Sequence, residues 1–178
     1  MDLNEFIDTF TGKWFSQRTT HDLQQKTSFL AKSDLWVDAV DNSDPAIKGL
    51  CDRYGVTPDQ VAIALKLRWE ATIAASPKKE TGTGAIALLK SDNPNQGHVL
   101  SDTTSTGVAQ PNPGTYVLGD DEALTFTLPL PSGKITERMW FASPNLRMRT
   151  STVTENGDPT VASFCSEIRM GGGPKKAE

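Results

Sequence analysis

Residues 134–151 read KITERMWFASPNLRMRTS, and residues 161–170 read VASFCSEIRM. Both segments have the β-branched and aromatic content of strands, and Ser143-Pro144-Asn145 marks a turn inside the first one. Charges enter a packed core only when they are paired or meet a ligand. The two segments therefore predict strands that line a cavity, because charged residues run through both: Glu137, Arg138, Arg147, Arg149, Glu167 and Arg169.

The rest of the chain repeats this strand character between turn signals. Residues 61–73 alternate with period two, so that Leu65, Leu67, Trp69, Ala71 and Ile73 share one face. Helical spacing of apolar residues predicts helices over 2–10 and 44–55. The other predicted strands cover 14–21, 27–40, 84–90, 97–105, 114–118, 123–130, 135–142, 146–155 and 160–170.

About ten short strands with only two helices predict an all-β protein built as an antiparallel meander. A single sheet of that length curls and closes, which removes its free edges. We therefore expect an up-and-down β-barrel of the lipocalin or fatty-acid-binding type, with a two-sheet sandwich as the alternative. Residues 1–170 are expected to form one domain, and residues 171–178 a disordered tail.

Composition narrows the function classes for this chain of 178 residues. The net charge of -4 with no basic stripe argues against nucleic acid, and no apolar run is long enough to span a membrane. The N-terminus lacks the features of a signal peptide, so a cytosolic setting is expected. There Cys51 and Cys165 are expected as free thiols, and neither has the neighbours of a metal site.

Two arginines stand two residues apart at Arg147 and Arg149, so they face the same side of one strand. The pair suits a ligand with two carboxylates, although a solvated outer face explains it equally well. Glu137 and Glu167 are candidate counter-ions or proton donors, with surface ion pairs as the alternative. A hairpin that pairs Phe141 with Arg147 puts Glu137 on the arginines' face; other loop lengths separate them.

Aromatic residues are the other candidates for ligand contact. Trp69 lies on the Leu65–Ile73 face, and Trp140 lies on the face of Thr136 and Arg138. Each tryptophan more often fills a core than stacks on a ligand. The chain contains no nucleophile elbow, P-loop or dinucleotide fingerprint, which argues against an ordinary hydrolase or kinase.

Several segments together resemble the S-type phycobiliprotein lyases. The strongest match is WFASPNLRMR at residues 140–149, and the likeness runs from about Gly12 to Met170. The chain departs from the family pattern at Ala71, at 77–81 and between 91 and 131. The other matching segments are GKWFSQRT at 12–19, LCDRYGV at 50–56, WEAT at 69–72 and ASFCSEIR at 162–169.

The resemblance implies a lipocalin-like barrel that binds a linear tetrapyrrole, or bilin, as substrate, with no permanent cofactor. Such a lyase promotes a thioether bond between the bilin and a cysteine of an apo-phycobiliprotein subunit. It implies that Arg147 and Arg149, with Arg18, hold the two propionates. Glu137 or Glu167 would accept hydrogen bonds from the pyrrole nitrogens, and Trp69 and Trp140 would line the pocket.

The resemblance also bears on partners and setting. The expected bilin is phycoerythrobilin or phycocyanobilin, and the expected acceptor is a β subunit. The location would be a cyanobacterial cytoplasm or an algal plastid stroma. Monomer, homodimer and heterodimer all stay open. The alternatives are a bilin or lipid carrier without attachment activity and a scaffold that has lost its pocket.

Overall fold

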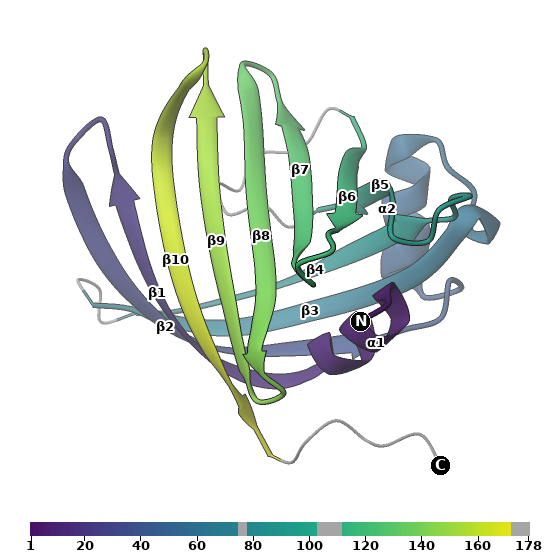
Figure 1. Ribbon diagram of the computed structural model, residues 1–178, viewed down its shortest axis with the longest axis horizontal. Helices are drawn as coiled ribbons and strands as arrows, with labels where there is room; N and C mark the ends of the chain where they lie inside the picture. Colours follow the sequence, from purple (N-terminus) through teal and green to yellow (C-terminus); the bar gives the residue numbers. More distant parts are fainter. Residues whose placement is uncertain (75–77, 103–111, 172–178) are drawn as a thin grey trace.

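Ten antiparallel strands close into a barrel in the computed structural model, which describes residues 1–74, 78–102 and 112–171 (Figure 1). Each strand pairs with its neighbours in sequence, and β1 pairs with β10 to complete the ring. The predicted barrel with two short helices is confirmed, and the two-sheet sandwich is wrong. In chain order the elements are α1 (Leu3–Phe10), β1 (Gly12–Asp22), β2 (Thr27–Ala39), α2 (Pro45–Tyr54), the 3-10 turn η1 (Pro58–Gln60), β3 (Val61–Ile73), β4 (Lys79–Leu89), β5 (Gln96–Ser101), β6 (Gly114–Leu118), β7 (Leu124–Leu130), β8 (Gly133–Ser143), β9 (Leu146–Glu155) and β10 (Asp158–Met170).

Helix α1 begins with a reciprocal cap and buries one face. The Asp2 carboxylate accepts from the backbone N–H of Glu5, and the Glu5 carboxylate accepts from that of Asp2, both at 2.9 Å. The buried face packs into the barrel interior, and its Phe6 ring lies 4.9 Å from that of Phe141 on β8. Helix α1 thus closes one end of the barrel with apolar side chains: Leu3, Phe6, Ile7 and Phe10.

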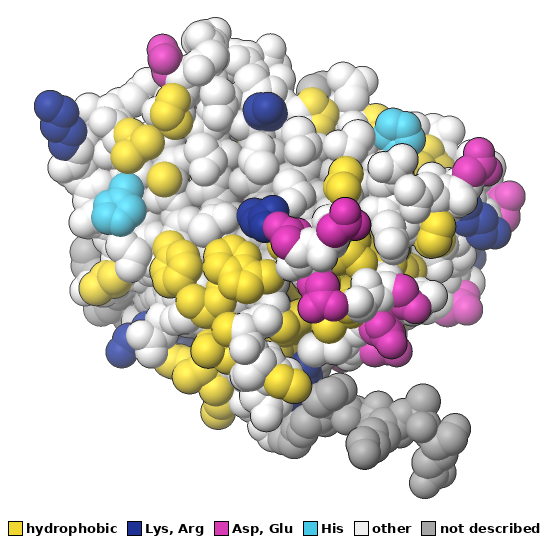
Figure 2. Space-filling view, in the orientation of Figure 1, with side chains coloured by type: hydrophobic (Ala, Val, Ile, Leu, Met, Phe, Trp, Pro, Cys, Tyr) yellow, Lys and Arg dark blue, Asp and Glu magenta, His cyan; other side chains and the backbone are white. Residues whose placement is uncertain are grey.

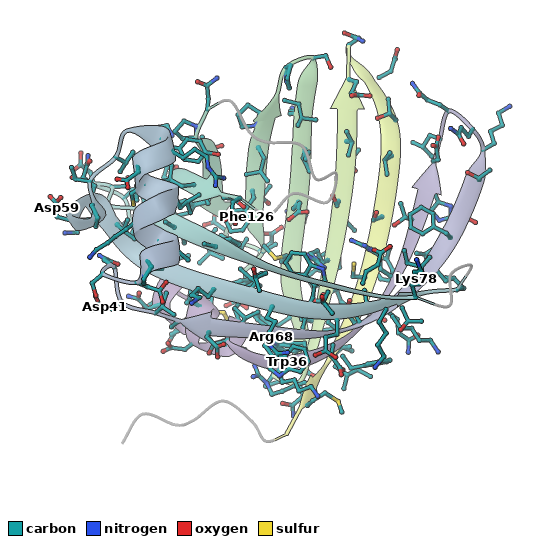
Figure 3. All side chains as sticks on the ribbon, turned by 180° about the vertical axis from the view of Figure 1, so that it is seen from behind. Trp36, Asp41, Asp59, Arg68, Lys78 and Phe126 are labelled. Carbon is teal, nitrogen blue, oxygen red and sulfur yellow. The ribbon has the colours of Figure 1, made fainter. Side chains whose placement is uncertain are left out.

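Helix α2 packs on the outside of the barrel instead. Asp44 caps it, Pro45 occupies its first turn, and Gly55 ends it at a φ of 65°. Its buried side chains contact small residues on the outer faces of β3 and β4, including Ala64 and Ala85. Figure 3 shows this helix standing against the sheet on the side opposite the front of Figure 1.

The closed end is sealed by Trp14, the tryptophan that opens β1. It is fully buried, and its indole N–H donates to the carbonyl of Phe10 at 3.0 Å. Two guanidinium groups stack on the ring, that of Arg147 at 4.4 Å and that of Arg169 at 4.2 Å. The opposite end, where the turns after β1, β7 and β9 lie, has no helix among the described residues and is called the mouth below.

The strand boundaries differ from prediction mainly at β4, which begins at Lys79 instead of residue 84. Glycine and threonine around Gly82 read as a loop, but Gly82 lies inside the strand, paired with Trp69. The predicted end of β5 at 103–105 and the predicted disordered tail from 172 onward lie outside the described residues. Among the described helices, none combines the length and apolar character needed to cross a membrane.

Candidate functional site

A cavity of about 270 Å³ lies inside the barrel between the closed end and the mouth. Apolar residues of β2 and β3 form one wall, and polar or charged residues of β1, β8, β9 and β10 form the other. All of them occupy inward-facing positions, because residues along each barrel strand point alternately inward and outward. The lining residues are Ser16, Arg18, Ala31, Ser33, Leu35, Leu67, Trp69, Ala71, Ile73, Glu80, Glu137, Arg149, Ser151, Ser163 and Cys165.

The hairpin between β8 and β9 settles the register that the sequence left open. Phe141 pairs with Arg147, and the ladder shifts by one residue before Ser143 pairs with Leu146. A β-bulge at the turn therefore gives the same register as a three-residue loop. As a result Glu137, Arg147 and Arg149 all face the barrel interior, which rules out the solvated outer face for the two arginines.

Arg149 reaches the cavity, and part of its guanidinium has no hydrogen-bond partner. Its Nη2 donates to Glu167 Oε1 at 3.1 Å and lies 3.7 Å from the Cys165 sulfur. The side chain is 25% exposed, yet its Nε is buried and has no hydrogen-bond partner. A buried guanidinium donor without an acceptor is costly. The exposed part of the Arg149 side chain lies in the cavity lining, where its positive charge suits a ligand carboxylate.

Arg147 and Glu167 do not face the cavity, which corrects the predicted roles of both. Arg147 Nε donates to Glu167 Oε2, Arg147 Nη1 donates to the Phe10 carbonyl at 3.3 Å, and both side chains are 1% exposed or less. The arginine lies between the rings of Phe10 and Trp14. This ion pair belongs to the sealed end of the barrel, so Arg147 has no free donor for a propionate.

Glu167 is a buried anion and not a proton donor. Burial alone raises the pKa of its carboxyl, but the positive charges of Arg149 and Arg147 outweigh burial and hold the pKa below its ordinary value. Of the two roles considered for Glu167, counter-ion and proton donor, the lowered pKa favours the counter-ion. Its two oxygens are taken by the two arginines, so it orients Arg149 instead of touching a ligand.

Arg18 and Glu137 are two of the charged side chains in the cavity lining, together with Glu80 and Arg149. Both side chains are half-buried in its lining, and neither has an ion pair or side-chain hydrogen bond within the part of the chain that the structure describes. Arg18 lies on β1 opposite Cys165 of β10, and Glu137 lies on β8 opposite Ser151 of β9. A cation and an anion are thus available for a ligand from different walls.

Trp69 and Trp140 lie on opposite faces of the barrel wall. Trp69 lines the cavity, and its indole lies flat over Gly82, where an added Cβ would meet ring carbon Cζ2 at 2.1 Å. Trp140 is absent from the lining because its neighbours Met139 and Phe141 point inward to the core. The prediction that Trp140 lines the pocket is therefore wrong, since the period of two places it on the outer face.

Sequence reasoning missed several lining residues. Glu80 fell in the supposed loop before β4, so its place at the cavity could not be seen. Two of the serines could have been predicted from their spacing. Ser16 lies two residues before Arg18 on β1, and Ser163 lies two residues before Cys165 on β10, so each shares a face with a lining residue. Polar residues at every second position of neighbouring strands indicate a wet interior, and this rule would have found them.

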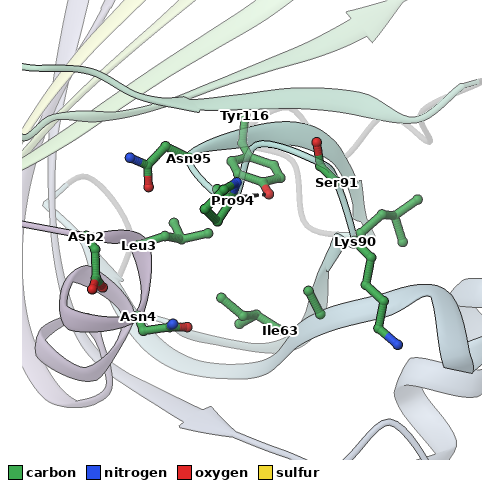
Figure 4. A pocket seen from close by; sticks show the side chains of 11 residues that line it. Asp2, Leu3, Asn4, Ile63, Lys90, Ser91, Pro94, Asn95 and Tyr116 are labelled. Atoms are coloured by element: carbon green, nitrogen blue, oxygen red, sulfur yellow. Dashed lines mark hydrogen bonds between the residues drawn. The ribbon is translucent and has the colours of Figure 1, made fainter.

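A second cavity of about 290 Å³ lies outside this site, beside the start of α1 (Figure 4). It is lined by parts of α1, β3 and the β4–β5 connection, with Lys90 as its only basic residue. The Tyr116 hydroxyl at its wall donates to the Pro94 carbonyl at 3.2 Å. It contains none of the predicted site residues, so the barrel interior is the stronger candidate.

The chain matches known proteins over nearly its whole length. A family model described as CpeS-like protein matches residues 2–170. The chain belongs to the CpeS-like family. This confirms the family resemblance found in the sequence, and the matched range includes every residue of the cavity lining.

Curated relatives in this family are named as lyases. The chain is 36% identical over 96% of its length to "Chromophore lyase CpcS/CpeS" of Thermosynechococcus vestitus, covering 94% of that protein. It is 31% identical over 99% of its length to "Phycocyanobilin lyase subunit CpcS" of Picosynechococcus sp., covering 90% of that protein. The lyase class predicted from the sequence is confirmed by these full-length matches.

A solved structure supports the fold. The S-type phycobiliprotein lyase CPES from Guillardia theta superposes with a TM-score of 0.83 and 24% sequence identity. The match covers 97% of this chain and 94% of the other. The two proteins thus share the barrel of Figure 1 across nearly the whole chain.

Proposed function

We propose that this lyase binds a linear tetrapyrrole in the barrel and promotes its thioether attachment to a cysteine of an apo-phycobiliprotein subunit. The observation that carries this proposal is the convergence of Arg18, Glu137 and Arg149 on one cavity whose other wall is apolar and contains Trp69. A bilin has two propionates, an extended apolar ring system and pyrrole nitrogens that share a positive charge. The cavity offers a matching group for each of these features.

The roles follow from which groups are free. Arg149 and Arg18 hold the propionates by charge-assisted hydrogen bonds, and Glu167 keeps Arg149 in place. Glu137 accepts from the pyrrole nitrogens and stabilises the protonated pigment. Trp69 and the apolar wall of β2 and β3 contact the rings.

The mechanism is mainly one of positioning. At about 270 Å³ the cavity lies at or below the lower end of small-molecule pockets, about 300–1,000 Å³, so a bilin extends beyond it toward the mouth. The pigment is then held in one conformer while its reactive end stays accessible. A partner thiol adds to a double bond at that end, and Glu137 favours the step by keeping the conjugated system positively charged and electrophilic.

Cys165 is not the nucleophile in this proposal, although it lines the cavity. It is 2% exposed, and its sulfur lies 3.7 Å from Nη2 of Arg149. The Cys165→Ser variant is expected to transfer bilin at a rate within about twofold of the wild type. Loss of transfer with bilin binding intact would show instead that a covalent adduct forms on this thiol.

We infer the finer points from the resemblance. The bilin is phycoerythrobilin or phycocyanobilin, and the acceptor is a β subunit. The setting is a cyanobacterial cytoplasm or an algal plastid stroma, which the cyanobacterial sources of the curated relatives support. Neither nucleic acid nor membrane is a partner.

One mixing experiment tests the proposal. The protein is incubated with each bilin and an apo-β subunit, the mixture is denatured, and pigment remaining on the subunit is measured against a sample without lyase. We expect covalent colour on the subunit, a yield well above the uncatalysed sample, and a sharp decrease in the Glu137→Gln variant. Bound pigment that is lost on denaturation would identify a carrier, and an unchanged bilin spectrum on mixing would identify a scaffold.

A further inference from the structure

Glu80 is the one charged residue of the described cavity lining that has no role in the proposed function. It is the second residue of β4, a strand that begins at the mouth, and it lies opposite Ala71 of β3. The residue is exposed, although its side chain contributes to the lining. None of the ion pairs between described residues involves it. Its negative charge is therefore available to a ligand that fills the barrel.

The charges of the lining follow a definite order around the barrel. Arg18 on β1 and Arg149 on β9 both lie opposite Cys165 on β10, so the two cations belong to one stretch of wall. Glu137 on β8 borders this stretch on one side. Glu80 lies beyond its other side, because the apolar wall of β2 and β3 separates β4 from β1. A ligand in the cavity therefore meets a cationic wall flanked by two separate carboxylates.

The mouth beside Glu80 also carries two cations. Lys78 and Lys79 directly precede it, both are exposed, and Figure 3 labels Lys78 beside the start of β4. Each lysine attracts carboxylates, so on their own the two would draw an anionic ligand group out of the cavity toward solvent. Of these three residues only Glu80 lines the cavity. A ligand inside the barrel therefore meets its negative charge first, and that charge opposes the attraction of the lysines.

This arrangement matters for a ligand that has carboxylates of its own, so the inference rests on the proposed bilin. Two propionates project from the middle rings of a bilin, and each terminal ring carries a lactam N–H. With the propionates on Arg18 and Arg149, a terminal ring extends toward the mouth, because the cavity of about 270 Å³ is too small for the whole pigment. There Glu80 accepts a hydrogen bond from the lactam N–H and repels a propionate, and both effects favour the same orientation.

We propose that Glu80 is a substrate-orienting residue of this lyase. It keeps the propionates on the cationic wall and presents the terminal ring at the mouth to the partner thiol in one geometry. Specificity of this kind depends on opposing the wrong arrangement as much as on favouring the right one. Glu80 should thus affect the rate of transfer from the bound state much more than the affinity for bilin.

Charge reversal at this position separates orientation from affinity. With phycocyanobilin and an apo-β subunit, Glu80→Lys is expected to bind the pigment at least as tightly as the wild type, because a propionate gains a cation at the mouth. Transfer from that complex should be slower by about tenfold or more. Glu80→Gln removes the charge but keeps an acceptor, so it should bind within about threefold of the wild type and transfer the pigment in a fast and a slow phase. Glu80→Asp should restore a single phase at the wild-type rate.

Asp8→Lys is the matched control, because it makes the same change of charge at an exposed position of α1. Figure 2 shows acidic side chains gathered around α1, at the closed end of the barrel, so this variant measures any long-range attraction of the anionic pigment. It is expected to bind and transfer the pigment as the wild type does. The visible circular dichroism of the bound pigment does not require transfer. It should change in Glu80→Lys and stay unchanged in Asp8→Lys.

The outcomes separate this inference from the proposed function. A wild type that transfers no pigment would overturn both. If the wild type transfers pigment and Glu80→Lys does so at the same rate with the same circular dichroism, only the orienting role is overturned. Equal losses of affinity and transfer rate in Glu80→Gln would overturn it as well, because they would assign Glu80 to binding alone.

Discussion

One carboxylate at the end of the barrel serves two arginines that have different surroundings. Glu167 accepts from Arg147, which is sealed beneath aromatic rings, and from Arg149, which extends into the cavity. The two arginines looked equivalent in the sequence because they are two residues apart. They differ in role because Phe10 and Trp14 cover Arg147, whereas Arg149 lies in the cavity lining.

Arg149→Lys and Arg147→Met are therefore expected to fail in different ways. Lysine cannot supply the planar fork of donors, so Arg149→Lys should weaken bilin binding about 10- to 100-fold with little loss of stability. Arg147→Met leaves a buried charge short of a partner and should lower the free energy of unfolding by about 3–5 kcal/mol. Bilin titration and denaturant unfolding of both variants check this; equal losses of affinity would contradict it.

Glu167 should make stability depend on pH. Its pKa is lowered by folding, so its contribution is fully present above the ordinary glutamate pKa of about 4.3 and is lost as the pH falls through the lower pKa of the folded state. Glu167→Gln should remove this dependence and cost about 3–5 kcal/mol at pH 7. Unfolding curves between pH 7 and 3 measure both effects, with Glu155→Gln as the control, because Glu155 is only half-buried and lies outside this ion pair. A variant with the wild-type pH profile would refute the assignment.

Between elements, the contact of β3 with β4 fixes one wall of the cavity. The indole of Trp69 fits against β4 only because Gly82 has no side chain. Gly82→Ala should push the ring into the cavity, shift the absorbance of bound bilin and weaken binding about tenfold. Overpacking should also cost about 1–3 kcal/mol of stability.

A double variant separates this role from simple loss of stability. If Gly82 acts through the indole, Gly82→Ala combined with Trp69→Leu should bind bilin as well as Trp69→Leu alone. Gly49→Ala on α2 is the matched control, because nothing lies within 4 Å of an added Cβ there. Equal effects of Gly82→Ala in both backgrounds would exclude a contact through Trp69.

The strands and helices could be predicted from the sequence because their signals are local. Alternation and turn residues predicted all ten strands, and helical spacing predicted the two helices. The main error was at Gly82, where the missing side chain makes room for the indole of Trp69 on the neighbouring strand. The site was only partly predictable. That Arg147 shares a face with Glu137, and that it is sealed from the cavity, depend on a bulge in one hairpin and on the position of α1.

For the whole molecule, the charged lining of the cavity implies that a bound ligand stabilises the fold. A bilin brings opposite charges to Arg18, Glu137 and Arg149, which lie together in this lining. At a bilin concentration 100 times its Kd the gain is about 2.7 kcal/mol, or roughly 5–10 °C in Tm. Thermal unfolding with and without bilin measures the shift. It should shrink in Arg149→Lys at the same bilin concentration; no shift in the wild type would count against the binding site.

The ring of strands is completed by the first and the last of them. Arg169, near the end of β10, donates to the carbonyl of Thr11 at 2.8 Å and stacks on Trp14, so the two ends of the barrel sequence are fastened together. While the chain is still on the ribosome, β1 has no partner for this edge. The barrel interior is therefore enclosed only after β10 has been synthesised, and a nascent chain that lacks β10 has no complete binding cavity.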